Sequence, residues 1–165
     1  MHARIDNPAV TVAGALRALQ GLGNAVKQAD IPETTLQLVE LRASQINGCS
    51  ICVDMHSREL KHLGEPDERI HLVAAWRESP YFTDAKRAAL ALAEAATWIV
   101  DRPDPVPDDV WKEAARHYDE AQLAALVVAI AAINAFNRIN AATRQITGDW
   151  VNQYIGQPEP AKQAA

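Results

Sequence analysis

Two cysteines and one histidine form the cluster in this 165-residue chain that is best suited to chemistry. Cys49 and Cys52 are its only cysteines, and His56 follows four positions after the second. If this segment is helical, the two cysteines lie one turn apart on one face, with His56 one turn beyond Cys52. The preceding Asn47-Gly48 is typical of a helix end, which places Cys49 in the first turn of a new helix, where unpaired N–H groups and the helix dipole favour a thiolate. The pattern therefore predicts a dithiol that cycles to a disulfide, with an imidazole near enough to move a proton.

Two other interpretations of the cysteines stay open. Free cysteines behave as small hydrophobic residues, so the pair could simply pack between helices. A zinc ion could take Cys49, Cys52 and His56 as ligands with Glu40 or His71 as a fourth, but no second Cys-x-x-Cys or paired histidine motif completes such a site. The helix dipole favours a low pKa at Cys49, which we expect to be the more exposed thiol. His56, however, neighbours Cys52 and could take its proton. Position alone therefore does not decide which cysteine attacks first. Redox chemistry without a metal or cofactor is the interpretation we favour.

Glu40 is the acid that we expect beside this cluster. It shares a helix face with Gln37 and Ser44, and the short Asn47-Gly48 turn can fold that helix against the cysteine helix. A carboxylate there could orient His56 or relay its proton through water, although a glutamate on a helix is more commonly a solvated surface residue.

A second polar group lies near the end of the last long apolar helix. Asn134, Asn137 and Arg138 follow a run that is rich in alanine, valine and isoleucine. Polar residues in such a place are commonly caps or hydrogen-bonding residues at a helix interface. The alternative is that they line the pocket, with Arg138 paired to Glu40.

The elements that must position these residues are helices, because no segment alternates like a strand between turn signals. We expect an all-α, single-domain bundle over residues 1–165 with about six or seven helices. Glycines weaken or divide the helix that begins near Pro8, and a polar tail from Gln157 is expected to fray. Further helices are expected at about 33–46, 49–63, 65–76, 84–100, 108–118 and 120–147.

Composition narrows the classes of partner. The chain is 48% hydrophobic with a net charge of −5 and no dense lysine or arginine cluster, which argues against nucleic acid and anionic membrane surfaces. The N-terminus lacks the apolar region of a signal peptide, and the longest apolar run, 123–133, is short for a membrane span, so we expect a cytoplasmic protein. That run predicts a helix buried on all sides, and because a small bundle cannot bury so apolar a helix alone, we expect a homo-oligomer.

The segment 38–56, and within it the run Ser-Gln-Ile-Asn-Gly-Cys-x-x-Cys-x-x-x-His, resembles the cysteine-containing branch of the alkylhydroperoxidase D and carboxymuconolactone decarboxylase superfamily. The likeness covers about 36–144. It implies an all-helical fold in trimers or hexamers, and reduction of peroxide at the Cys-x-x-Cys pair, with Cys52 meeting the peroxide and His56 in a proton relay with a glutamate. The family glutamate corresponds to Gln37, which cannot titrate, so we expect Glu40 to replace it. Ile51 stands where founding members carry a histidine.

These observations lead to one functional hypothesis and two rivals. We expect a thiol-dependent peroxidase or disulfide reductase that uses Cys49 and Cys52, takes a small peroxide, and is reduced by a dithiol or disulfide electron-donor protein. One rival is a cofactor-free decarboxylase of the carboxymuconolactone type, which needs no cysteine pair. The other is a redox-sensing or adaptor protein whose disulfide passes electrons to a partner without efficient turnover.

Overall fold

The computed structural model describes residues 2–100 and 102–148, and this part of the chain is entirely helical, with no strand. The expected all-α fold is confirmed, although the expected tail from Gln157 lies outside the described residues. The described elements are α1 (Pro8–Thr11), α2 (Ala15–Val26), α3 (Glu33–Asn47), α4 (Ser50–His62), α5 (Asp67–His71), the 3-10 helix η1 (Val73–Glu78), α6 (Asp84–Thr97), α7 (Asp108–Ala115) and α8 (Glu120–Thr143).

The described residues form nine helices instead of six or seven because two of the expected helices are divided. Gly14 has a φ of 83°, a left-handed conformation that glycine adopts at little cost, and it separates α1 from α2. The helix expected at 65–76 divides after His71, and the second piece continues as 3-10 turns with a non-helical residue at Ala75.

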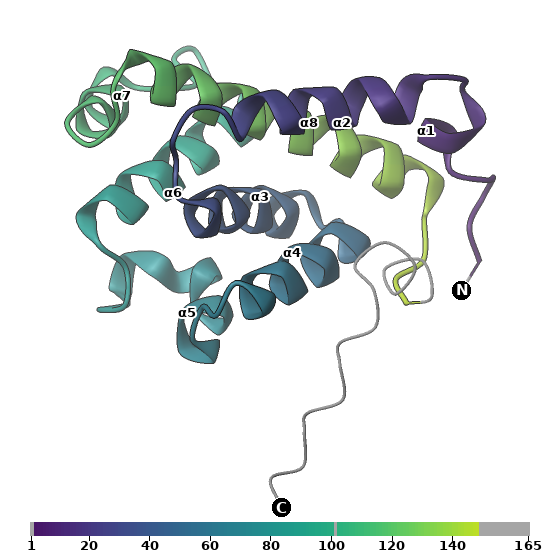
Figure 1. Ribbon diagram of the computed structural model, residues 1–165, viewed down its shortest axis with the longest axis horizontal. Helices are drawn as coiled ribbons and strands as arrows, with labels where there is room; N and C mark the ends of the chain where they lie inside the picture. Colours follow the sequence, from purple (N-terminus) through teal and green to yellow (C-terminus); the bar gives the residue numbers. More distant parts are fainter. Residues whose placement is uncertain (1, 101, 149–165) are drawn as a thin grey trace, which may run out of the picture.

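Helix α3 lies at the centre of the molecule and packs against α4, α6 and α8 (Figure 1). Its side chains supply two separate hydrophobic clusters: Leu36 and Val39 face one that α6 and α8 complete, and Leu38 and Leu41 face another that includes α4 and η1. All four are buried. Because α3 is held from several sides, the polar residues that it carries are fixed relative to α4 and α8.

Helix α8 is only half buried, which corrects the expectation that it is buried on all sides. Its packing partners, chiefly α2, α3 and α6, lie along part of its circumference, and Val127 and Val128 remain 39% and 36% exposed. By length and composition it is the one helix in the described part of the chain that could cross a membrane, but half of its apolar stretch packs inside the molecule. Helix α8 starts at a capping box on Asp119 and ends at Thr143 because Arg144 turns into the left-handed conformation.

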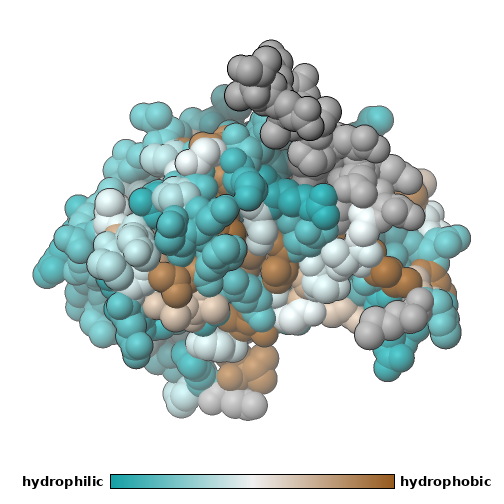
Figure 2. All heavy atoms as spheres, turned by 90° about the horizontal axis from the view of Figure 1, so that it is seen from below, coloured by the Kyte–Doolittle hydropathy of each residue, from teal (hydrophilic) through white to brown (hydrophobic). Residues whose placement is uncertain are grey.

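Figure 2 shows one face of the molecule, seen from below the view of Figure 1. Hydrophilic residues dominate this face, and hydrophobic ones gather in small patches across its middle.

Candidate active site

The turn between α3 and α4 positions the cysteines. Gly48 adopts a φ of 66° as the C-cap of α3, and the backbone N–H of Cys49 donates to the carbonyl of Ser44 at 3.0 Å. The chain then reverses, so that Cys49 is the N-cap of α4 and its Sγ accepts from the backbone N–H of Cys52 at 3.4 Å. A sequence-local turn therefore places one cysteine at the helix start and the other one turn later.

Cys49 and Cys52 are joined by a disulfide, with their Cα atoms 5.4 Å apart. Both are buried, at 2% and 1% exposed, so the structure does not show the greater exposure that was expected of Cys49. The physical reason is that the turn presses Cys49 against Ala43 and Ile133, in a small hydrophobic cluster that also holds Cys52. Access to the sulfurs must therefore come through cavities.

His56 lies one turn beyond Cys52 on α4 and is 5% exposed. Its Nδ1 is 2.8 Å from Oε1 of Gln37 and 3.5 Å from Oε2 of Glu40. The glutamine oxygen can only accept a hydrogen bond, so Nδ1 carries the proton and the lone pair is on Nε2. Nε2 is buried and has no hydrogen-bond partner among the described residues. The geometry therefore leaves a ring nitrogen with a free lone pair on a residue that lines the same cavity as Cys52.

Burial sets the protonation of this pair. It lowers the pKa of His56 to about 4 and raises the pKa of Glu40 to about 8, the latter against the opposing pull of Lys27. At neutral pH the imidazole and most of the Glu40 carboxyl population are therefore uncharged. A carboxyl with a pKa of about 8 is close to the ordinary thiol value of about 8.5, which suits proton exchange with a cysteine.

A cavity of about 470 Å³ opens beside Cys52. Gln37 and Glu40 of α3 line it together with Cys52 and His56 of α4. Its apolar wall comes from α2, α4 and α8 and includes Leu16, Leu19, Met55, Ile133 and Phe136. The wall from α2 was not expected, because the sequence marked the N-terminal helix only as a divided apolar segment.

Asn140 is a site residue that sequence reasoning missed. Its Nδ2 lies 3.4 Å from Sγ of Cys52, and its side chain is buried in α8. A usable signal was present, since Asn134, Asn137 and Asn140 recur every three residues on one helix.

The other polar residues that were candidates for the pocket form a network behind it. The Nδ2 of Asn47 donates to the side chains of Asn134 and Asn137, both at 2.9 Å, and Asn137 donates to Oγ of Ser44 at 3.1 Å. This network joins the C-terminal end of α3 to α8. The residues expected to line the pocket were Gln37, Ser44, Asn134, Asn137 and Arg138, and of these only Gln37 lines the cavity beside Cys52.

Arg138 does not form the pair with Glu40 that the alternative interpretation of this group proposed. It donates to the backbone and side-chain oxygens of Asn134 at 3.2 and 3.0 Å, within its own helix. Within the described ranges, no group of three or more histidine, cysteine or acidic residues is placed to hold a metal ion. His71, considered as a zinc ligand, is exposed on α5.

Known proteins share both the sequence and this fold. A family model for the carboxymuconolactone decarboxylase family matches residues 13–95. The uncharacterized protein YdfG of Bacillus subtilis is 37% identical over 127 residues, which are 77% of this chain and 85% of that protein. The uncharacterized protein YnjA of Escherichia coli is 33% identical over 116 residues, which are 70% of this chain and 62% of that protein, so the match spans less than two thirds of YnjA.

Solved structures of other proteins have the same fold as this chain. A protein of unknown function from Agrobacterium tumefaciens, described as a candidate antioxidant defence protein AhpD, superposes with a TM-score of 0.82 at 36% identity, over 89% of this chain and 99% of that one. The debrominase Bmp8 has a TM-score of 0.75 at 22% identity, over 87% of this chain and 76% of Bmp8, and shares the fold alone. With its family model, its relatives and its Cys-x-x-Cys pair, the chain belongs to the carboxymuconolactone decarboxylase family and has an AhpD-like fold.

Proposed function

We propose that the protein is a thiol-dependent peroxidase, or disulfide reductase, in which Cys49 and Cys52 cycle between dithiol and disulfide. One observation carries the proposal: disulfide-bonded Cys52 lines the same cavity as a buried imidazole, that of His56, whose Nε2 has no hydrogen-bond partner among the described residues. A nitrogen of this kind can take the proton of a neighbouring thiol. The similarity to a candidate antioxidant protein supports the same function.

Cys52 is the proposed nucleophile because it lines the same cavity as His56 and Glu40. In the reduced protein, Nε2 of His56 takes the Cys52 proton, and Nδ1 passes its own proton toward Glu40 in the fraction of molecules whose Glu40 carboxylate is ionised. The thiolate attacks one peroxide oxygen, the O–O bond breaks, and the departing alkoxide takes a proton and leaves as an alcohol. Cys52 becomes a sulfenic acid, which the Cys49 thiolate attacks to form the disulfide with loss of water. Two electrons pass from the cysteines to the peroxide, and an external dithiol returns them.

Serine variants of each cysteine test this mechanism. We expect Cys49→Ser and Cys52→Ser each to lose peroxide turnover in an assay with dithiothreitol as the reductant, while circular dichroism shows the helical content unchanged. Cys52→Ser should also stop the first oxidation, whereas Cys49→Ser should still form a sulfenic acid that a dimedone probe can trap. Loss of less than tenfold in both variants would rule the mechanism out.

A decarboxylase of the carboxymuconolactone type is the second candidate, because the matching family carries that name. Such an enzyme needs acid–base groups and no thiol, so its activity would survive blocking of both cysteines. A redox sensor would instead oxidise rapidly without turnover. The remaining parts of the proposal are a cytoplasmic homotrimer or homohexamer that takes a small peroxide and a dithiol donor, and binds neither nucleic acid nor membrane.

A further inference from the structure

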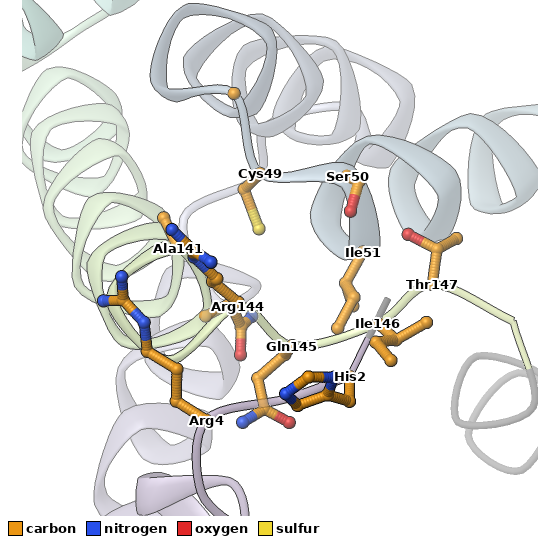
Figure 3. A pocket seen from close by; sticks show the side chains of 12 residues that line it. His2, Arg4, Cys49, Ser50, Ile51, Ala141, Arg144, Gln145, Ile146 and Thr147 are labelled. Atoms are coloured by element: carbon orange, nitrogen blue, oxygen red, sulfur yellow. The ribbon is translucent and has the colours of Figure 1, made fainter.

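A second cavity lies on the Cys49 side of the disulfide. It has a volume of about 680 Å³, within the size range of small-molecule sites, and Cys49, Ser50 and Ile51 at the start of α4 form one part of its wall. Figure 3 shows the sulfur of Cys49 pointing into this hollow, with the side chains of His2 and Arg4 on the opposite side. The chain has a separate cavity beside each of its two sulfurs, since Cys52 lines the other one.

The two cavities differ in charge. The described lining of the Cys49 cavity contains Arg4, Arg144 and His2, and no acidic residue. The described lining of the Cys52 cavity contains Glu40 and one lysine. A cluster of two arginines at a reactive sulfur stands out in a chain whose net charge is −5.

The two arginines are held differently. Arg4 is fixed to the end of α8, because its backbone N–H donates to the carbonyl of Thr143 at 2.9 Å and its Nη1 donates to the carbonyl of Ala142 at 3.0 Å. Arg144 is the left-handed C-cap of α8, and its side chain is exposed. An arginine fork is suited to a planar carboxylate, and the positive end of the α4 dipole lies in the same cavity.

We propose that the Cys49 cavity binds a low-molecular-weight thiol that carries a carboxylate, with Arg144 and Arg4 holding the carboxylate while the thiol reduces the disulfide. This inference rests on the proposed function, since it names the class of reductant for that cycle. Because Cys49 is only 2% exposed as a residue, its recessed sulfur admits a thiol on a slender molecule more readily than a cysteine on a protein surface.

The reductive step balances as two thiol–disulfide exchanges. The incoming thiolate attacks Sγ of Cys49, the Cys49–Cys52 bond breaks, and Cys52 leaves as a thiolate that takes a proton on the side of His56 and Glu40. A second thiol, from the same molecule or another, then attacks the reductant sulfur of the mixed disulfide and releases Cys49. The reductant is oxidised to a disulfide, and the protein gains two electrons and two protons. Attack at Cys49 is favoured because the leaving group is then the cysteine whose cavity contains His56 and Glu40.

A pair of nearly isosteric reductants tests the carboxylate site. The rate of disulfide reduction is measured by stopped flow, without peroxide, for 3-mercaptopropionate and for the neutral 3-mercaptopropionamide. The quantity compared is the ratio of the two rate constants, because intrinsic differences between the thiols cancel when one protein is compared with another. We expect the ratio to fall about tenfold in Arg144→Gln and in Arg4→Gln, and to be largely kept in Arg144→Lys.

Arg116→Gln is the matched control, since Arg116 is an exposed arginine that pairs with Glu113 and lines neither cavity. It should leave the ratio unchanged. A ratio that is the same in wild type and both glutamine variants would overturn the carboxylate site, as would an equal fall in Arg116→Gln. Peroxide consumption driven by neutral dithiothreitol separately tests the proposed function, so failure of the carboxylate site is distinguishable from failure of the peroxidase cycle.

Discussion

The buried carboxyl of Glu40 should make the stability of this protein depend on pH in an unusual direction. Its pKa in the folded protein is about 8, well above the ordinary 4.5, because burial disfavours the charged form. A group whose pKa is higher in the folded state stabilises the fold at low pH and loses that contribution as the pH rises through the folded value. Replacement by glutamine, a neutral side chain of the same shape, should therefore remove a cost that exists only at higher pH.

His56 acts in the opposite direction. Its folded pKa of about 4 is below the ordinary 6.5, so its contribution is present above pH 6.5 and is lost as the pH falls toward 4. Between pH 4.5 and 6.5 the two slopes oppose each other, and stability is nearly level. Above pH 6.5 only the Glu40 contribution continues to change, and at 1.36 kcal/mol per pH unit the wild type should lose at most about 2 kcal/mol between pH 6.5 and 8.

The full cost of ionising Glu40 in the folded protein follows from the same conversion. The difference between 4.5 and about 8 corresponds to about 5 kcal/mol, and the 19% exposure of the side chain, which admits water, reduces our expectation to about 2 to 4 kcal/mol. Glu40→Gln should be more stable than wild type by that amount at pH 8.5 and should match it near pH 4.5.

Urea denaturation monitored by circular dichroism at half-unit steps from pH 4.5 to 9 measures both curves. Glu78→Gln is the matched control, because Glu78 is exposed at the end of η1 and its removal should leave the shape of the wild-type curve unchanged. If Glu40→Gln and wild type lose stability in parallel above pH 6.5, then Glu40 ionises freely in the fold and the assigned proton relay loses its acid.

Three further predictions concern the turn at Gly48, the contact of Asn140 with Cys52, and the oligomeric state. Gly48→Ala should cost about 1 kcal/mol of unfolding free energy by calorimetry, because a Cβ there meets no atom within 4 Å and only the left-handed φ opposes it; an unchanged midpoint would contradict this. Asn140→Ala should raise the pKa of the Cys52 thiol, followed through thiolate absorbance, because it removes a donor 3.4 Å from Sγ; an unaltered titration would show that the contact does not stabilise the thiolate. Sedimentation should give a species larger than the 18.0 kDa chain, and a monomer at micromolar concentration would refute the oligomer.

The sequence could predict the parts of the site whose geometry is set by residues close together in the chain. The Asn47-Gly48 turn, the one-turn spacing of the cysteines and the register of His56 are set by local backbone geometry. Because this turn is short, it also fixes how α4 folds back against α3. Gln37 and Glu40 share one face of α3, so their position beside His56 could be predicted.

The rest depends on contacts between distant segments, which periodicity does not encode. Helix α2 forms a wall of the Cys52 cavity only because it packs on α8, more than a hundred positions along the chain from it. The sequence left open whether Arg138 pairs with Glu40. A long side chain can reach an acceptor one turn back on its own helix at a smaller cost in ordering, and Arg138 donates to Asn134. No sequence pattern pointed to Arg144, because its proposed role in the Cys49 cavity depends on the N-terminal segment returning to the end of α8.

The position of the disulfide between two unlike cavities gives a direction to the proposed cycle. Because His56 and Glu40 line the cavity of Cys52, Cys52 would be both the better nucleophile toward peroxide and the better leaving group during reduction, since the same pair of side chains can take and return one proton. The described lining of the Cys49 cavity has a histidine, His2, but no acidic residue to pair with it, and it has two arginines, which attract an anion and do not exchange protons near neutral pH. Oxidant and reductant would then approach the disulfide from opposite sides, and neither would have to leave before the other could enter.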